Sequence, residues 1–367
     1  MFRLLAALAL LAFASPAFAE DKPKPNTLTP KEIADGWILL FDGETTFGWK
    51  IDGAAEVKDG ALILGKDKKT TAVFPAHANF TNKYDIQMEW SGKGTVRAGI
   101  SLNTFDLDHE PKMYWGGFKA FSDGEKLTSG TSTWGAGTFG VKRRLPGEPF
   151  IKIETDGKTP AILRSLKLRP TGTEPLFTGK NLDGWKVNAA DPKRAASKWD
   201  VTKDGELSVK NGPGDLVTEK EFDNFVLQFE CKTNGKALNS GFFFRCIPGQ
   251  YQNGYEAQIQ NAYKDDDRTK PADFGTGAIY RRVAARKVVS NDNEWFTMTV
   301  VADGKHIATW VNGYQTVDWT DDRKENDNPR TGYRAAKGPI SIQGHDPTTD
   351  ILFRNIRIAE LPAGKKE

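Results

Sequence analysis

The segment GYEAQIQNAY, residues 254–263, has the alternating pattern of a β-strand. Alternate side chains of a strand point to the same side, so Glu256, Gln258 and Gln260 would share one face. The opposite face would carry the apolar side chains of Tyr255, Ala257 and Ile259. A row of three long polar side chains indicates either a solvated sheet face or a polar cleft that binds a polyhydroxylated ligand.

Alternating segments of this kind recur along most of the chain. They are rich in Val, Ile, Phe, Thr and Trp and are separated by Gly, Asn and Asp, as in YDIQMEW (84–90), FVLQFEC (225–231) and ILFRNIRI (351–358). Turn signals follow one another at roughly 8 to 12 residues, which is typical of β-sandwiches. No long stretch has a period of 3.6 residues. We therefore predict an all-β protein.

The chain also contains an internal repeat. LLFDGETTFGWK (39–50) matches PLFTGKNLDGWK (175–186) at an offset of 136 residues, and ILRSLKL (162–168) matches LFRNIRI (352–358) at an offset of 190. The second copy therefore holds about 54 additional residues, and these include GYEAQIQNAY. Two homologous sandwiches are expected, and a single site for chemistry would belong to the second.

Two further segments of the second copy place polar residues on alternate positions. In NSGFFFRC (239–246), Asn239, Gly241, Phe243 and Arg245 would share a face, with Phe242 and Phe244 in the core. In GPISIQGH (338–345), Ile340 and Ile342 would face the core, and Ser341, Gln343 and His345 the other way. A sheet that is apolar on one side and bears Arg, Glu, Gln and His on the other favours the cleft over the solvated face.

The ordered set LFTGKNLDGW, NSGFFFR, GYEAQIQN, TGAIY, WVNG and GPISIQGHDPTTDILFRNIRI resembles the 3-keto-disaccharide hydrolase domain family. The resemblance covers residues 174–361 fully and residues 36–170 in degenerate form, and it implies two tandem concanavalin A-like jelly-roll sandwiches. The expected division is a signal peptide at 1–19, a linker at 20–35, an accessory or carbohydrate-binding domain at 36–172 and a hydrolase-like domain at 173–362.

The resemblance implies cleavage of glycosides that carry a ketone at C3. The ketone acidifies the C2 proton, so the group on C1 can leave by elimination and water can then add. Such a route needs a base, a stabiliser for the enolate oxygen and an acid. We expect Glu256 as base, His345 as acid or second base and Arg245 as enolate stabiliser. The residues expected to bind sugar hydroxyls are Asn239, Gln258, Tyr280 and Gln343.

Several alternatives remain open at this stage. Glu256 and Arg245 could form a cross-strand ion pair, and His345 could be a turn residue that bonds to the backbone. Asn261 stands where the family has Asp, and Phe296 replaces the usual Asn after Trp. If that Asp is a catalytic or metal-binding carboxylate in relatives, the protein is a weakened enzyme or a non-catalytic carbohydrate-binding protein.

Composition limits the partners and the location. Residues 1–19 have a basic start, an apolar run and the Ala17-Phe18-Ala19 form of a signal-peptidase site, so an exported, periplasmic or extracellular protein without a membrane anchor is expected. A net charge of +3 with evenly mixed signs argues against a nucleic-acid partner. Cys231 and Cys246 could form a disulfide or remain buried thiols. No cofactor is expected, and a divalent metal is left open.

Overall fold

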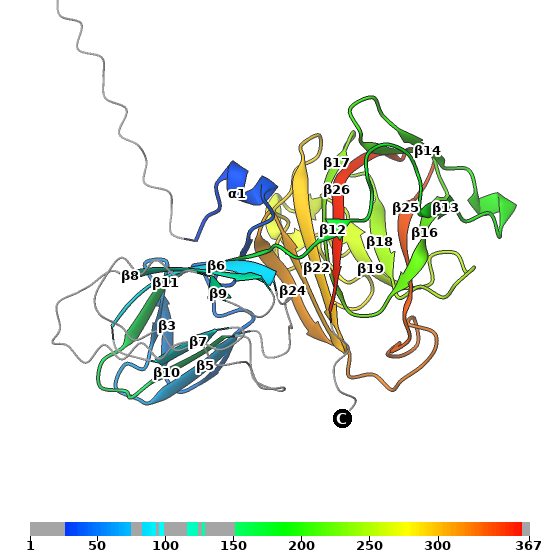
Figure 1. Cartoon of the computed structure of the whole chain (residues 1–367). Coiled ribbons are helices and arrows are strands. Elements are labelled where there is room, and N and C mark those ends of the chain that lie inside the picture. The colour runs from blue at the N-terminus through cyan, green and yellow to red at the C-terminus, as the bar shows by residue number, and fades with distance from the viewer. Residues whose placement is uncertain are drawn as a thin grey trace, which may run out of the picture.

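The computed structural model describes residues 26–74, 83–92, 95–98, 116–123, 127–128 and 151–361. Its elements are almost all strands, and they form two sandwiches side by side (Figure 1). The expected signal peptide, residues 1–19, lies outside the described residues. Within the described residues, no helix has the length and apolar character needed to cross a membrane.

The first sandwich has two sheets. One has the order β3 (Ala55–Lys58), β4 (Ala61–Leu64), β11 (Ala161–Pro170), β6 (Lys83–Gly92), β8 (Gly116–Asp123) and β9 (Leu127–Thr128), with β1 (Ile38–Leu39) paired to β11. The other has the order β2 (Lys50–Asp52), β5 (Thr70–Phe74), β10 (Ile151–Thr155) and β7 (Thr95–Ala98).

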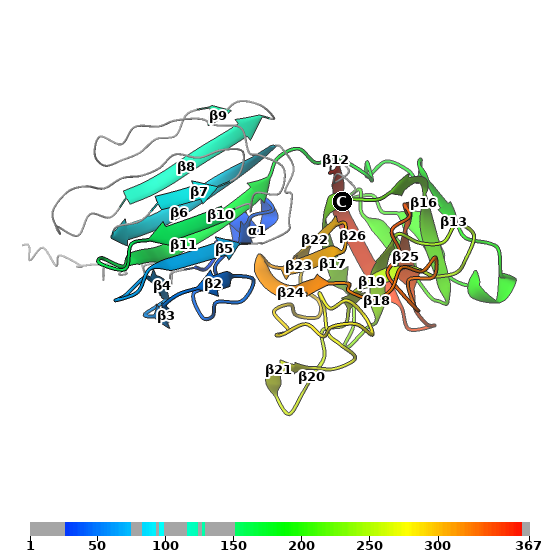
Figure 2. The ribbon, with the colours of Figure 1, turned by 90° about the horizontal axis from the view of Figure 1, so that it is seen from below.

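The second sandwich repeats this order and extends it. Its eight-stranded sheet runs β14 (Lys198–Val201), β15 (Leu207–Lys210), β26 (Asp350–Glu360), β17 (Phe225–Thr233), β22 (Phe296–Asp303), β23 (His306–Val311) and β24 (Tyr314–Thr320), with β12 (Glu174–Pro175) on β26. Its five-stranded sheet, called here the site sheet, runs β13 (Trp185–Val187), β16 (Gly214–Phe222), β25 (Gly338–Gly344), β18 (Ser240–Phe244) and β19 (Tyr255–Ile259). A separate hairpin, β20 (Tyr263–Lys264) and β21 (Asp267–Pro271), projects from this sandwich (Figure 2), and a short 3₁₀ turn covers Pro192–Arg194.

The sequence repeat corresponds to a repeated structural feature. The Trp49 indole N–H donates to the Leu40 carbonyl at 2.9 Å, and the Trp185 indole N–H donates to the Leu176 carbonyl at 2.9 Å. Both bonds span nine residues and lie 136 residues apart, the offset of the sequence match. The tryptophans therefore close equivalent corners of the two sandwiches.

Strand alternation builds the core of the second sandwich as expected. Tyr255, Ala257 and Ile259 of β19 pack in one apolar cluster with Phe242 and Ile342 from the neighbouring strands. Burial of such side chains is the main stabilising contribution to a sandwich. Glu256, Gln258 and Gln343, at the positions between these core residues, therefore point to the outer face of the site sheet.

The first sandwich packs against the eight-stranded sheet. Val226 and Val301, on its outer face, belong to the same apolar cluster as Ile38 and Leu40. The Trp310 indole N–H crosses between the sandwiches and donates to the Leu39 carbonyl at 2.9 Å. The contact uses the sheet opposite the site sheet, so the outer face of the site sheet stays available.

Residues 26–35, the described part of the segment expected as an extended linker, are packed against the first sandwich and partly helical. The Asn26 amide is buried and donates to the Gly60 and Arg164 carbonyls. Helix α1 (Pro30–Ala34) follows, and Thr29 and Glu32 form its capping box. The sequence TPKE holds both the capping pair and a helix-starting proline, so the high content of Pro and Lys was misleading.

Candidate active site

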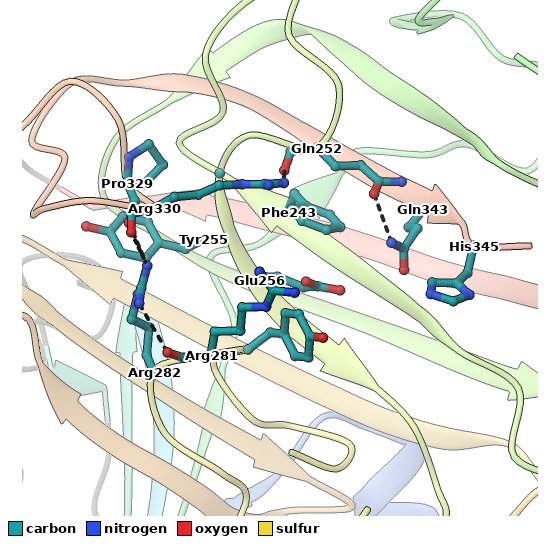
Figure 3. A pocket seen from close by; sticks show the side chains of 12 residues that line it. Phe243, Gln252, Tyr255, Glu256, Arg281, Arg282, Pro329, Arg330, Gln343 and His345 are labelled. Carbon is teal, nitrogen blue, oxygen red and sulfur yellow. Dashed lines mark hydrogen bonds between the residues drawn. The ribbon is translucent and has the colours of Figure 1, made fainter. Parts of the chain in front are cut away.

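A cavity of about 470 Å³ opens on the outer face of the site sheet (Figure 3). Phe243, Glu256 and Gln343 reach it from β18, β19 and β25, the three strands that the sequence predicts to converge. His345, directly after β25, lines the same cavity. The Glu256 carboxyl and the His345 imidazole therefore lie on the same side of the sheet.

Glu256 is the buried acid of this cavity. Its residue is 8% exposed, and no side-chain hydrogen bond to its carboxyl occurs among the described residues. Burial raises the pKa of Glu256 to about 8, and the nearby Asp273 carboxylate acts in the same direction, whereas Arg330 and Arg281 oppose the shift. The carboxyl is thus far more basic than an ordinary glutamate.

The absence of a side chain at Gly241 leaves room for the Glu256 carboxyl. It lies opposite Gln258, diagonal to Glu256 on the neighbouring strand, and a Cβ added there would lie 2.6 Å from a Glu256 carboxyl oxygen. That distance is shorter than any side-chain contact allows. The glycine of NSGFFF is therefore required for the position of the Glu256 carboxyl.

His345 is oriented by its own loop. Its Nδ1 lies 2.7 Å from the Asp346 carboxylate, which leaves Nε2 for other partners. Hydrogen bonds from Thr348 and His345 lower the pKa of Asp346, so this carboxylate stays an anion beside the His345 ring. The Thr349 hydroxyl accepts the main-chain N–H groups of both His345 and Asp346. The arrangement contains the turn contacts expected for a structural histidine and also presents the ring to the cavity.

Three arginines from loops form one rim of the cavity. Arg281 extends over the Tyr280 ring at 5.3 Å, and Arg330 donates to the Gln252 carbonyl at 2.7 Å. Arg282 donates to the Arg330 carbonyl at 2.6 Å, which ties the segment between β21 and β22 to the loop after β24. The sequence pattern did not reveal these arginines because loop residues have no strand period.

Two glutamines line the cavity next to Arg330. The Gln343 amide donates to the Gln252 side-chain oxygen at 2.9 Å, and both residues are buried. Tyr280 lines the cavity beside Arg281. Four of the seven residues expected from the sequence therefore meet in one cavity: Glu256, Tyr280, Gln343 and His345. Within the described parts of the chain, no group of three His, Cys, Asp or Glu side chains could hold a metal ion.

A sequence model of the 3-keto-alpha-glucoside-1,2-lyase-like domain matches residues 172–359. The chain belongs to this family. The matched residues contain the whole site sheet and every residue that lines the cavity. A search of the curated proteins found no match.

Solved structures similar to this chain include two from Parabacteroides distasonis ATCC 8503, each described as a candidate glycosyl hydrolase. One is 24% identical with a TM-score of 0.42 and covers 52% of this chain and 94% of its own. The other is 28% identical with a TM-score of 0.39 and covers 52% and 99%. A carbohydrate binding module from Bacillus subtilis is 15% identical with a TM-score of 0.35 and covers 49% and 97%.

Arg245 of the lyase-like domain lies outside the cavity, contrary to our expectation. Strand β18 ends at Phe244, and Arg245 has a φ of 48°, so the alternation stops one residue too early. The side chain is fully buried and donates to the Asp223 and Gly304 carbonyls and to the Asn224 side chain. It joins loops and cannot contact a ligand or pair with Glu256.

Asn239 and Gln258 bind Asp273, a carboxylate that lies near Glu256. Both side-chain amides donate to the Asp273 carboxylate, at 2.9 and 3.2 Å. Asp273 is the charge that adds to the raised pKa of Glu256. Both residues lie beside the cavity of the lyase-like domain, and neither is among those that line it. Their observed contacts are with Asp273.

The two departures from the family pattern lie away from the cavity. The Asn261 side chain donates to Asp292 and accepts hydrogen bonds from the Thr276 and Ser290 hydroxyls, both at 2.6 Å. Phe296 packs in the core of the lyase-like domain. Neither substitution removes a group from the cavity.

The structure has no disulfide between the two cysteines of the chain. Cys231 and Cys246 are both free and buried. Burial raises the pKa of both thiols, so neither is a reactive thiolate.

Proposed function

We propose that this protein cleaves 3-keto-glycosides by elimination followed by hydration, with Glu256 as the base. The Glu256 carboxylate takes the proton from C2, the C1–C2 double bond forms and the C1–O bond breaks. The leaving oxygen takes a proton, and water then adds its hydroxyl to C1 and a proton to C2. The products are a 3-keto-sugar and the free alcohol.

The observation that carries this proposal is the state of Glu256. A carboxyl with a pKa of about 8 is a much stronger base than an ordinary glutamate, and a useful fraction is ionised near neutral pH. It lacks a side-chain hydrogen bond within the part of the chain that the structure describes, and it faces an open cavity. These are the properties required of a base that removes a carbon-bound proton.

The other roles follow from position and charge. Arg281 and Arg330 lie close enough to Glu256 to lower its pKa, so they are placed to stabilise the enolate oxygen in the position first assigned to Arg245. His345, whose ring is oriented by Asp346, would protonate the leaving oxygen. Gln343 and Tyr280 would bind hydroxyl groups. Export through the segment at residues 1–19 is part of the same proposal.

The test compares a 3-keto-glucoside with its unoxidised parent, using the wild type and Glu256→Gln. Release of the aglycone from the keto form alone, lost in the variant, is the expected result. Binding of both sugars without any release would leave a carbohydrate-binding protein and contradict the enzyme. Cleavage of the unoxidised parent at a similar rate would contradict the elimination route.

A further inference from the structure

The segment between β21 and β22 connects the active-site cavity with the first sandwich. Tyr280, Arg281 and Arg282 of this segment line the cavity. Arg286, four residues after Arg282, contacts the first sandwich instead. None of the described residues of the first sandwich lines the cavity. One short stretch of chain therefore joins the active site to a domain that lies outside it.

Every nitrogen of the Arg286 guanidinium has a partner. Its Nε donates to the Gln315 carbonyl at 2.8 Å, one Nη donates to the Thr45 hydroxyl at 3.0 Å, and the other Nη donates to the Asp42 carboxylate. The Asp42 side chain is 5% exposed and that of Arg286 19%. Loss of either partner of such a pair leaves the other charge buried and unpaired, so the contact is strongly maintained.

Aromatic rings and a second ion pair extend the contact. The Arg286 guanidinium lies over the Phe47 ring at 4.2 Å and over the Tyr314 ring at 4.4 Å. The Lys287 ammonium lies 3.4 Å from the Glu44 carboxylate. Arginine combines forked hydrogen bonds with stacking on aromatic rings, so the direction of the Arg286 side chain is fixed.

The loop that holds Arg286 belongs to the tryptophan corner of the first sandwich. Trp49 and Trp185 close equivalent corners of the two sandwiches. At the offset of 136 residues, the four corner residues that contact Arg286 or Lys287 correspond to unlike residues of the second copy: Asp42 to Thr178, Glu44 to Lys180, Thr45 to Asn181 and Phe47 to Asp183. The corner is common to both copies, whereas the contact requires residues that only the first copy has.

The turn at residues 279–283 carries this contact to the rim of the cavity. Its first and last residues exchange main-chain hydrogen bonds at 3.0 and 2.9 Å, and its main chain is also hydrogen-bonded to β19 at 2.9 Å. The turn holds two of the three rim arginines, Arg281 and Arg282. Arg282 donates to the carbonyl of the third, Arg330, so all three are linked (Figure 3). Arg286 attaches the end of this turn to the first sandwich.

We propose that the first sandwich positions the active site, by holding Arg286 in its corner loop and thereby fixing the turn that carries the rim arginines. Asp42 and Arg286 are positioning residues, since neither lines the cavity. This role differs from that of a separate carbohydrate-binding module. The inference rests on the proposed function for what the rim arginines do. Its own evidence is the set of contacts between residues 42–47 and 286–287.

The experiment measures kcat and KM on a 3-keto-glucoside for the full chain, Arg286→Met, Asp42→Asn and the double variant. Each single variant should lower kcat about tenfold and leave KM within about twofold, because a misplaced arginine loses its contact with the transition state. The double variant should be no slower than Arg286→Met, because both changes remove the same contact. Gln228→Met is the matched control and should keep the wild-type kcat. It removes a 2.9 Å hydrogen bond to the Gly36 carbonyl, which also joins the sandwiches but lies on the sheet opposite the cavity.

Hydrogen exchange gives a second readout that does not depend on catalysis. The amides of Ile279 and Val283 should exchange about tenfold faster in Arg286→Met than in the wild type or Gln228→Met. Exchange at the wild-type rate, a wild-type kcat, or an equal fall of kcat in Gln228→Met would each overturn the inference. If Arg286→Met fails to fold, as seen from its melting temperature, the same measurements on Asp42→Asn decide. If the wild type cleaves no 3-keto-glucoside, the proposed function fails, and the exchange rates alone decide whether the first sandwich fixes the turn.

Discussion

The two sheets of the second sandwich each hold a buried glutamate, and the surroundings of the two differ. Glu230 on β17 is 6% exposed, and one oxygen accepts two hydrogen bonds from the Arg354 guanidinium at 2.7 and 2.9 Å. Its other oxygen accepts from Asn355, and Arg354 also stacks over Trp295 at 4.0 Å. Glu256 on β19 is 8% exposed and lacks such bonds within the described residues.

Glu230 contributes to the stability of the fold, whereas Glu256 is available for chemistry. Both carboxylate oxygens of Glu230 accept hydrogen bonds from residues of β26, so this carboxylate holds strands β17 and β26 together. No described side chain donates to Glu256, and the cost of its burial is expressed as a raised pKa. Within the described residues, the fold supplies three donors to one buried glutamate and none to another at similar burial, so the second is available for a ligand.

The largest expected effect is on catalysis. Glu256→Gln should lower kcat/KM on a 3-keto-glucoside roughly 10²–10⁴-fold, because it removes the base and keeps the shape. Glu230→Gln is the matched control, since it changes the same residue type at the same burial on the opposite sheet. It should lower stability by about 1–3 kcal/mol and leave kcat/KM of the folded protein within threefold. Equal losses of activity in the two variants would contradict the claim that Glu256 acts in catalysis and Glu230 only in stability.

The raised pKa of Glu256 should also appear in the pH dependence of the unfolding free energy. Its pKa rises from 4.5 to about 8 on folding, so its stabilising contribution is complete below pH 4.5 and is lost as the pH rises through 8. The unfolding free energy of the wild type should therefore fall by roughly 3–5 kcal/mol over this window relative to Glu256→Gln. Denaturant titrations at pH 5 and pH 8.5 measure the difference, and parallel curves would show that the Glu256 pKa is ordinary. Activity should rise with pH up to about 8, because the base must be ionised.

Arg245 and Arg281 form a second contrasting pair. Arg245→Met should lower the unfolding free energy by roughly 3–5 kcal/mol, because it removes the buried guanidinium that donates to the Asp223 and Gly304 carbonyls and to the Asn224 side chain. Turnover by the remaining folded protein should stay near the wild-type rate. Arg281→Met should do the reverse and lower kcat/KM with little change in melting temperature. An exchange of these phenotypes would restore the original assignment of Arg245 to the site.

His345 is expected to give the smallest effect. His345→Asn should lower kcat/KM about 10–100-fold for a sugar leaving group and much less for nitrophenol, which leaves without a proton. Asp346→Asn should show a weaker form of the same dependence, because it removes only the carboxylate that orients the His345 ring. Kinetics with a series of leaving groups measures this, and an equal loss across the series would remove His345 from the acid role.

The sequence predicted the strands and the shared face because both depend on alternation. Glu256 and Gln343 lie within regular strands, and the family motifs surround them. The prediction failed at Arg245, where a positive φ ends the period. It also missed Arg281, Arg330 and Gln252, because the loops that carry them are positioned by tertiary contacts.

The most direct test of the central claim follows the hydrogen at C2. A 3-keto-glucoside with deuterium at C2 is cleaved in ordinary water, and the released 3-keto-sugar is analysed by nuclear magnetic resonance. If Glu256 removes that hydrogen, the product carries protium at C2, and Glu256→Gln neither exchanges nor cleaves. Release of a sugar that keeps its C2 deuterium would show ordinary hydrolysis at C1 and contradict the account.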